Sequence, residues 1–356
     1  MFFSFFQKCA NAVVENGRLR IKDERILYTN AFLCIFFFLV WIIVGYTLDS
    51  GAWDDRIWHL DMMGNPGMKK QRVNGTVRIV EKTTENRKTS FCENKGGSLN
   101  KNGFMAEPAN ALSNYAFCVY GFITIASGMQ DLANGVEGRS YKYVLVDVPW
   151  WSFLLGISQL FMGVGSFVYH AGITRLGQTL DVAGIYIILF NLMVCMLARF
   201  IHDVERWGTK LVLVAHVILL SIALISDVLF CLYKWNMNSL QGMIGFISCL
   251  LVLTVVHRFT TKRSVYTPFV IGSIVSLALG YLAWIGDKVR WWCDYTSFFQ
   301  GHACWHVLVA TSYFCGYLTV RSEGMQDDAE RESSNDDVSI AIEIVSREKN
   351  VEEETY

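Results

Sequence analysis

The chain has 356 residues, of which 53% are hydrophobic and 18% charged, and its formal net charge is −1. Its mean hydropathy of +0.31 is high for a soluble protein of this length. The near-neutral charge gives no sign of nucleic-acid binding and names no partner by itself. The distribution of apolar residues along the chain is therefore more informative than the overall composition.

Eight segments are apolar and long enough to span the hydrocarbon core of a bilayer, which takes ~20 helical residues. They are residues 27–46, 109–128, 150–170, 177–198, 210–232, 239–257, 266–286 and 303–320. This pattern predicts an all-α polytopic membrane bundle, with a seven-helix core and one extra N-terminal transmembrane helix. Polar side chains within the spans are costly in lipid, so we expect them to face the bundle interior.

Lysine and arginine residues concentrate in the loops on one side of the predicted spans, which places both termini in the cytosol. The only N-x-[ST] sequon begins at Asn74, in the long loop assigned to the lumen, and predicts one glycan. We expect residence in the endoplasmic reticulum or Golgi membrane. The predicted regions are a cytosolic N-terminus (1–26), an anchor helix (27–46), a luminal loop (47–89), a seven-helix bundle (90–320) and a disordered acidic cytosolic tail (321–356).

Two of the ten cysteines, Cys92 and Cys293, lie in predicted luminal loops, whereas most of the others lie within spans. The lumen is oxidising. Each of the two cysteines shortly precedes a polar stretch at the luminal start of a span. We predict that they form a disulfide; the alternative is two separate thiols.

Histidines at helical spacing suggest a metal site inside the bundle. Ser166 and His170 are four residues apart and share a helix face, as do His302 and His306 at the luminal start of the last span. Asp181 follows a short turn after His170 and begins the next span. The three histidines therefore lie near the same leaflet, and three imidazoles with one open position are typical of catalytic zinc.

Each of these features also has a purely structural explanation. A single histidine in a span more often packs or forms a hydrogen bond than binds metal. No partner at ligand spacing accompanies the histidines at positions 59, 202, 216 and 257. A haem or ion-transport bundle would also use histidine ligands, but it would not explain Asp181 and Ser166.

Residues 105–114 form a third polar stretch. Glu107 precedes a proline at a helix start, where a carboxylate favours the helix dipole, and Ser113 and Asn114 follow on the first turns. These residues either cap the helix or serve the site. In the second case Ser113 and Asn114 would hydrogen-bond the metal-site region and Glu107 would help to hold a cation.

The order and spacing of these motifs resemble the alkaline ceramidases over residues 90–320. The matching residues are Ser166, His170 and Asp181, then His302 and His306, and the earlier Glu107, Ser113 and Asn114. This superfamily also contains adiponectin receptors and post-GPI-attachment lipid-remodelling proteins, and the Glu-Pro-Ala stretch at 107–109 is similar to the latter. A GPI-anchor lipid hydrolase and a receptor-like zinc-binding protein therefore remain alternatives.

The resemblance implies a zinc-dependent hydrolase that cleaves the N-acyl bond of ceramide to a sphingoid base and a free fatty acid. It implies zinc ligation by the three histidines, Asp181 as the proton acceptor and donor, and Ser166 as a donor to the oxyanion. A calcium site with Glu93 and Glu107 is also implied. In this chain, however, the segment Ser-Phe-Cys-Glu-Asn at 90–94 lacks the leading Asp of the family motif and its Asn is displaced by one. The expected partner is a membrane lipid, with no nucleic acid and no obligatory protein partner.

Overall fold

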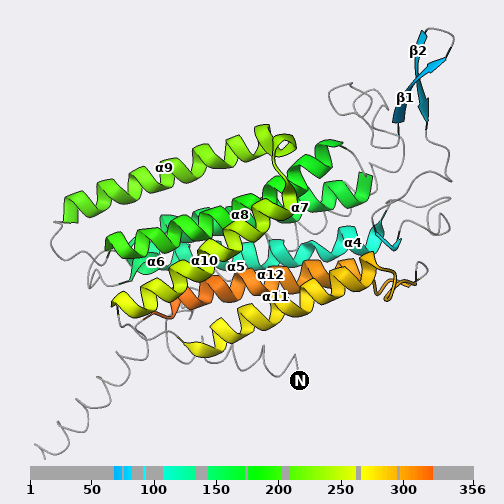
Figure 1. The fold of residues 1–356 in the computed structure, drawn as a ribbon. Coiled ribbons are helices and arrows are strands. Elements are labelled where there is room, and N and C mark those ends of the chain that lie inside the picture. The colour runs from blue at the N-terminus through cyan, green and yellow to red at the C-terminus, as the bar shows by residue number, and fades with distance from the viewer. Residues whose placement is uncertain are drawn as a thin grey trace, which may run out of the picture.

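The computed structural model describes residues 68–73, 76–81, 91–93, 107–133, 143–172, 175–202, 209–261, 266–294 and 297–323. Within these ranges the fold is a bundle of long helices lying side by side, together with a β-hairpin (Figure 1). The predicted anchor helix at 27–46 and the glycan acceptor Asn74 lie outside the described residues.

The bundle begins with the short helix α4 and continues with long helices that are joined by short connections. In chain order its elements are α4 (Pro108–Ser113), α5 (Tyr115–Ala133), the short α6 (Val144–Asp147), α7 (Trp150–Gly172), α8 (Arg175–His202), α9 (Thr209–Tyr233), the 3₁₀ turn η4 (Lys234–Asn236), α10 (Ser239–Thr261), α11 (Thr267–Lys288) and α12 (Gly301–Arg321).

Seven stretches of the described chain are long and apolar enough to cross a membrane, with α4 and α5 together forming the first. They coincide with the seven core spans predicted from the sequence, so the protein is an integral multi-pass membrane protein. The helices extend beyond several predicted limits. For example, α8 covers Arg175–His202, where the prediction was 177–198.

The region 47–89, predicted as a loop, contains an antiparallel hairpin of β1 (Met68–Val73) and β2 (Thr76–Glu81). Its register pairs Met68 with Glu81 at one end and Val73 with Thr76 at the other. At the C-terminal side, Arg321 still belongs to α12, and both Arg321 and Glu323 are buried. The bundle therefore extends to residue 323 instead of ending at 320 as predicted.

Helices α5, α7, α8 and α12 form the interior of the bundle, and α11 packs along α12. Helices α9 and α10 pack mainly against α8 and lie at the outside of the bundle (Figure 1). Many of the large apolar side chains of α9, α10 and α11 are exposed, as expected for surfaces that face lipid. The polar residues of the predicted site lie instead on the interior helices.

Candidate metal centre

Three buried histidines from two helices meet at one end of the bundle. His170 lies in the last turn of α7, and His302 and His306 lie in the first two turns of α12. Each offers one ring nitrogen, and these three atoms lie within 4.8 Å of one another. The cluster predicted from helix spacing is therefore formed, and it can hold a metal ion.

Two glycines allow the helices that carry the site to approach closely. A Cβ atom on Gly301 would lie 2.7 Å from the carbonyl oxygen of Ala283, so only glycine lets the start of α12 reach α11. A Cβ atom on Gly165 would lie 3.0 Å from the backbone of Leu180. Ser166 follows Gly165 and Asp181 follows Leu180, so this close contact of α7 with α8 also brings Ser166 near Asp181.

Hydrogen bonds fix the proton positions on two of the histidines. His170 Nδ1 lies 2.6 Å from Glu107 Oε2, and a carboxylate accepts, so Nδ1 carries the proton. His306 Nδ1 lies 3.0 Å from the backbone carbonyl oxygen of Asn110, which can only accept. In both rings Nε2 is left with a free lone pair. A carboxylate or carbonyl behind a metal-binding imidazole is a common arrangement, because it orients the ring and raises its basicity.

The polar stretch after Glu107 supports this geometry. Ser113 Oγ lies 2.9 Å from His306 Nδ1 and donates to the Asn110 carbonyl oxygen at 2.8 Å. Asn114 Nδ2 also donates to that carbonyl oxygen. Asn114 is therefore linked to His306 only through the Asn110 carbonyl that both side chains contact. The side chain of Ser113 thus contacts the candidate site directly, whereas that of Asn114 does not.

The spacing between the His170 and His302 nitrogens fits a tetrahedral metal ion. His170 Nε2 and His302 Nε2 are 3.3 Å apart. Two nitrogens that each lie ~2.05 Å from one tetrahedral zinc ion are separated by about 3.3 Å. The donor set, its tautomers and this distance therefore agree with a bound zinc ion.

Ser166 and Asp181 lie beside His170, on α7 and α8. Asp181 is half-buried and close enough to His170 and Ser166 to interact with both side chains. Ser166 is fully buried and lies one helical turn before His170 on α7. Both polar side chains therefore lie at the end of α7 and α8 that carries the histidine cluster.

Lys234 is a further charged residue near the site, and the sequence analysis assigned it no role there. It is buried in η4 with its Nζ atom 3.3 Å from the centroid of the Trp235 ring. The Trp235 indole donates to Thr179 Oγ1 on α8 at 2.9 Å, which fixes the turn against that helix. Lys234 is also close enough to interact electrostatically with Asp181.

The two residues suggested for calcium have other partners in the structure. Both oxygens of Glu93 accept backbone N–H groups at the start of α4, from Ala109 at 2.6 Å and Asn110 at 2.9 Å. Burial raises the pKa of the Glu93 carboxyl to about 7 and the nearby Glu107 charge adds to this, although the two N–H groups favour the ionised form.

Ca²⁺ takes about 6–8 oxygen ligands. In the described residues the same Glu107 oxygen faces both His170 and Asn110, and Glu93 caps a helix. A calcium site at Glu93 and Glu107 stays a prediction, because residues 94–106 between them lie outside the described residues.

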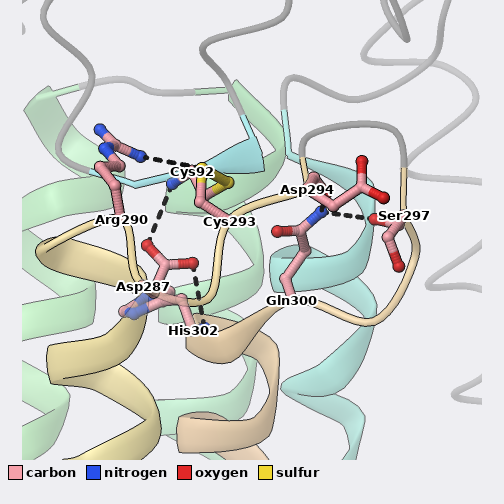
Figure 2. The surroundings of a disulfide bond; sticks show 8 residues. All are labelled: Cys92, Asp287, Arg290, Cys293, Asp294, Ser297, Gln300 and His302. Carbon is pink, nitrogen blue, oxygen red and sulfur yellow. Dashed lines mark hydrogen bonds between the residues drawn. A yellow bond between two sulfur atoms is a disulfide. The ribbon is translucent and has the colours of Figure 1, made fainter.

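A disulfide joins Cys92 and Cys293, with their Cα atoms 5.4 Å apart, which is the pairing expected from the sequence. Figure 2 shows that Asp287 of α11 lies between Cys92 and His302 and hydrogen-bonds the backbone of both. Phe91 stacks on the His302 ring with 3.7 Å between centroids. Neither Asp287 nor Phe91 is marked by any sequence pattern as part of the site.

In the part of the chain that the structure describes, seven helices able to cross a membrane and a buried three-histidine cluster define a polytopic membrane protein with a candidate metal site inside its bundle. The chain belongs to the ceramidase family, whose sequence profile matches residues 85–339. This match contains the histidine cluster, Ser166, Asp181 and both disulfide cysteines. Membership implies a hydrolase that acts on the amide bond of a lipid. No individual curated protein matches the chain in the sequence comparison.

Proposed function

We propose that the protein is a zinc-dependent intramembrane amidohydrolase that cleaves the N-acyl bond of ceramide to a sphingoid base and a free fatty acid. The observation that carries this proposal is the histidine cluster, in which Nε2 of His170 and His306 carries a lone pair and the spacing between His170 Nε2 and His302 Nε2 matches that of two zinc ligands. Membership in the ceramidase family supports the substrate class.

His170, His302 and His306 would hold the metal. A zinc ion bound there supplies a Lewis acid that activates water for attack at neutral pH. Glu107 accepts the Nδ1 proton of His170 and the Asn110 carbonyl accepts that of His306, so both rings keep the orientation that a metal requires.

Asp181 is the proposed general base and general acid. Its carboxylate takes a proton from the attacking water while the water oxygen bonds to the amide carbon. When the C–N bond breaks, Asp181 returns that proton to the departing sphingoid amine, and the water oxygen stays in the fatty-acid carboxyl. Its closeness to His170 and Ser166 supports this role, because both flank the place where the carbonyl must lie.

Ser166 is the proposed donor to the carbonyl oxygen as negative charge develops on it. Its hydroxyl is fully buried, lies one helical turn before His170 and interacts with Asp181, which supports a place for it beside the reacting carbonyl. Donors of this kind stabilise the transition state most strongly when they are already positioned in a site from which water is excluded.

A site inside the bundle suits a lipid with two chains, because the substrate can reach it without leaving the membrane. We propose an endoplasmic reticulum or Golgi location, with the site toward the luminal leaflet and both termini in the cytosol. The unequal distribution of Lys and Arg between the two sets of loops supports this orientation.

The direct test is to incubate the purified protein with matched lipid amides and esters, with and without a zinc chelator. We expect release of fatty acid from ceramide, loss of activity with chelator, recovery with added zinc, and about one zinc per chain. Hydrolysis of GPI-lipid esters in preference to ceramide would favour the lipid-remodelling alternative. Bound zinc without any turnover would favour the receptor-like one.

A further inference from the structure

The three histidines of the site are held in two different ways. His170 and His306 are each oriented through a ring nitrogen, by Glu107 and by the Asn110 carbonyl. His302 has no such support, because its Nδ1 is buried and makes no hydrogen bond in the structure. Another part of the molecule must therefore hold this ring in place.

The main chain of His302 is fixed by Asp287. The fully buried carboxylate of Asp287, in the last turn of α11, accepts the His302 backbone N–H through Oδ2 at 3.3 Å. The α12 N-cap residue, Gln300, makes no side-chain capping bond of its own. Asp287 thus supplies from a neighbouring helix the acceptor that an N-cap side chain normally provides.

The same carboxylate also holds the segment that covers the His302 ring. Asp287 Oδ1 accepts the backbone N–H of Cys92 at 3.0 Å, and Cys92 is tied to Cys293 by the disulfide (Figure 2). The preceding residue, Phe91, stacks on the imidazole at 3.7 Å with an angle of 27° between the ring planes. The backbone of His302 is therefore held by its hydrogen bond to Asp287, and one face of its ring is covered by Phe91. Both contacts depend on Asp287.

We propose that Asp287 is a positioning residue of the metal site, which holds His302 by capping α12 and by anchoring the Phe91–Cys92 segment. This inference rests on the proposed zinc function. Asp287 acts on the metal through His302, as Glu107 acts through His170. Loss of residues that orient metal ligands typically weakens metal binding by about 10–100-fold, and we expect Asp287→Asn to fall in that range.

The isosteric variant Asp287→Asn keeps the size of the side chain but leaves one oxygen for two N–H donors. We expect weaker zinc binding in competition with a chromogenic chelator, and an altered visible absorption spectrum of the cobalt-substituted protein. The matched control is Asp131→Asn. Asp131 is another buried carboxylate with two hydrogen bonds, to Arg321 at 2.7 and 2.9 Å, but it lies near the far end of α12. The control should lower thermal stability and leave the zinc affinity and the cobalt spectrum unchanged.

A double-mutant cycle separates positioning from general stability. If Asp287 acts through His302, Asp287→Asn should change zinc affinity much less in a His302→Ala background than in the wild type. Equal effects in both backgrounds would overturn the proposal, as would wild-type zinc affinity and an unchanged cobalt spectrum in Asp287→Asn.

A metal-free measurement distinguishes this inference from the proposed function. In the apoprotein, amide hydrogen exchange at His302 should be faster in Asp287→Asn than in the wild type. Unchanged exchange would contradict the capping role itself. A wild-type protein that binds no zinc but shows the faster exchange in the variant would refute the zinc function and leave the capping role standing.

Discussion

Buried histidines gather at both ends of helices α7 and α8, and the two groups differ in how their nitrogen atoms are used. At the site end, His170, His302 and His306 bring three nitrogens together. At the opposite end, His202 and His216 form a hydrogen-bonded chain. His202 lies in the last turn of α8, and His216 lies in α9 next to the N-terminal turn of α7.

The chain at the far end has a defined direction. The Trp151 indole N–H can only donate, so Nδ1 of His216 accepts at 3.1 Å and its Nε2 carries the proton. His216 Nε2 therefore donates to His202 Nδ1 at 3.2 Å, and His202 Nε2 donates to Asp147 Oδ2 at 3.1 Å.

All four ring nitrogens of His202 and His216 are therefore occupied by protein partners. The comparison teaches that a metal site is defined by unused lone pairs that converge, and not by the number of buried histidines. In the described residues, His170, His302 and His306 form the only group that qualifies.

Replacing a histidine at the two ends should have opposite consequences. We expect alanine at His170, His302 or His306 to remove most of the bound zinc and activity. This loss should exceed the ~100-fold upper range of the loss in metal affinity for residues that orient metal ligands. His216→Ala should keep zinc and lose thermal stability. Metal analysis by mass spectrometry is the measurement, and full zinc occupancy in any of the three variants would remove that residue from the ligand set.

Asp181 should separate chemistry from metal binding. Asp181→Asn keeps the shape of the side chain but cannot accept the proton, so we expect a fall in kcat of about 10²–10⁴-fold with zinc retained. The readout is fatty-acid release by zinc-loaded protein. Near-normal turnover would show that the proton acceptor is another group.

The two carboxylate–histidine pairs offer a matched test. Glu107→Gln should weaken zinc binding by about 10–100-fold, because Glu107 orients His170. Asp147→Asn alters the corresponding pair with His202 and should leave zinc affinity unchanged. If both variants weaken zinc binding equally, the distinction between the two ends is wrong.

Each end is also fastened differently, by a disulfide at the site end and by the buried Asp131–Arg321 ion pair near the other. The disulfide spans 201 residues of sequence, and disulfides typically contribute about 2–4 kcal/mol to stability. Cys92→Ser should lower the thermal midpoint, and reductant should lower that of the wild type but not that of the variant. A thermal midpoint of the wild type that is the same with and without reductant would argue against a stabilising role for the disulfide.

The smallest expected effect tests which end faces the lumen. If the site end is luminal, Asn74 carries a glycan, and glycosidase treatment should increase gel mobility in the wild type but not in Asn74→Gln. A shift that persists in the variant would contradict this acceptor. Zinc content and activity should be the same with and without the glycan.

Sequence reasoning was most successful where a local pattern carries the information. Apolar runs of about 20 residues located the seven core spans because a bilayer imposes that length. The i, i+4 spacing of His302 and His306 placed both on one helix face, and alternating spans brought His170 to the same depth. The shared luminal assignment of Cys92 and Cys293 was enough to pair them.

The same reasoning treated His202 and His216 as separate residues, but the structure joins them by a hydrogen bond. It also did not foresee that Glu93 caps α4 by accepting two backbone N–H groups. In each case the partner lies on another element, so spacing along one helix carries no sign of it.

The sequence by itself thus determined the seven core spans, the residue types of the site and the meeting of the three histidines at one end of the bundle. Only the tertiary structure decided which groups support each histidine. Glu107 and His170 are 63 residues apart in sequence, and the Asn110 carbonyl and His306 are 196 apart. Asp287 and Cys92 are likewise separated by 195 residues. Such contacts depend on how helices pack, and a backbone carbonyl or amide is present at every residue, so no side-chain pattern marks the one that will be used.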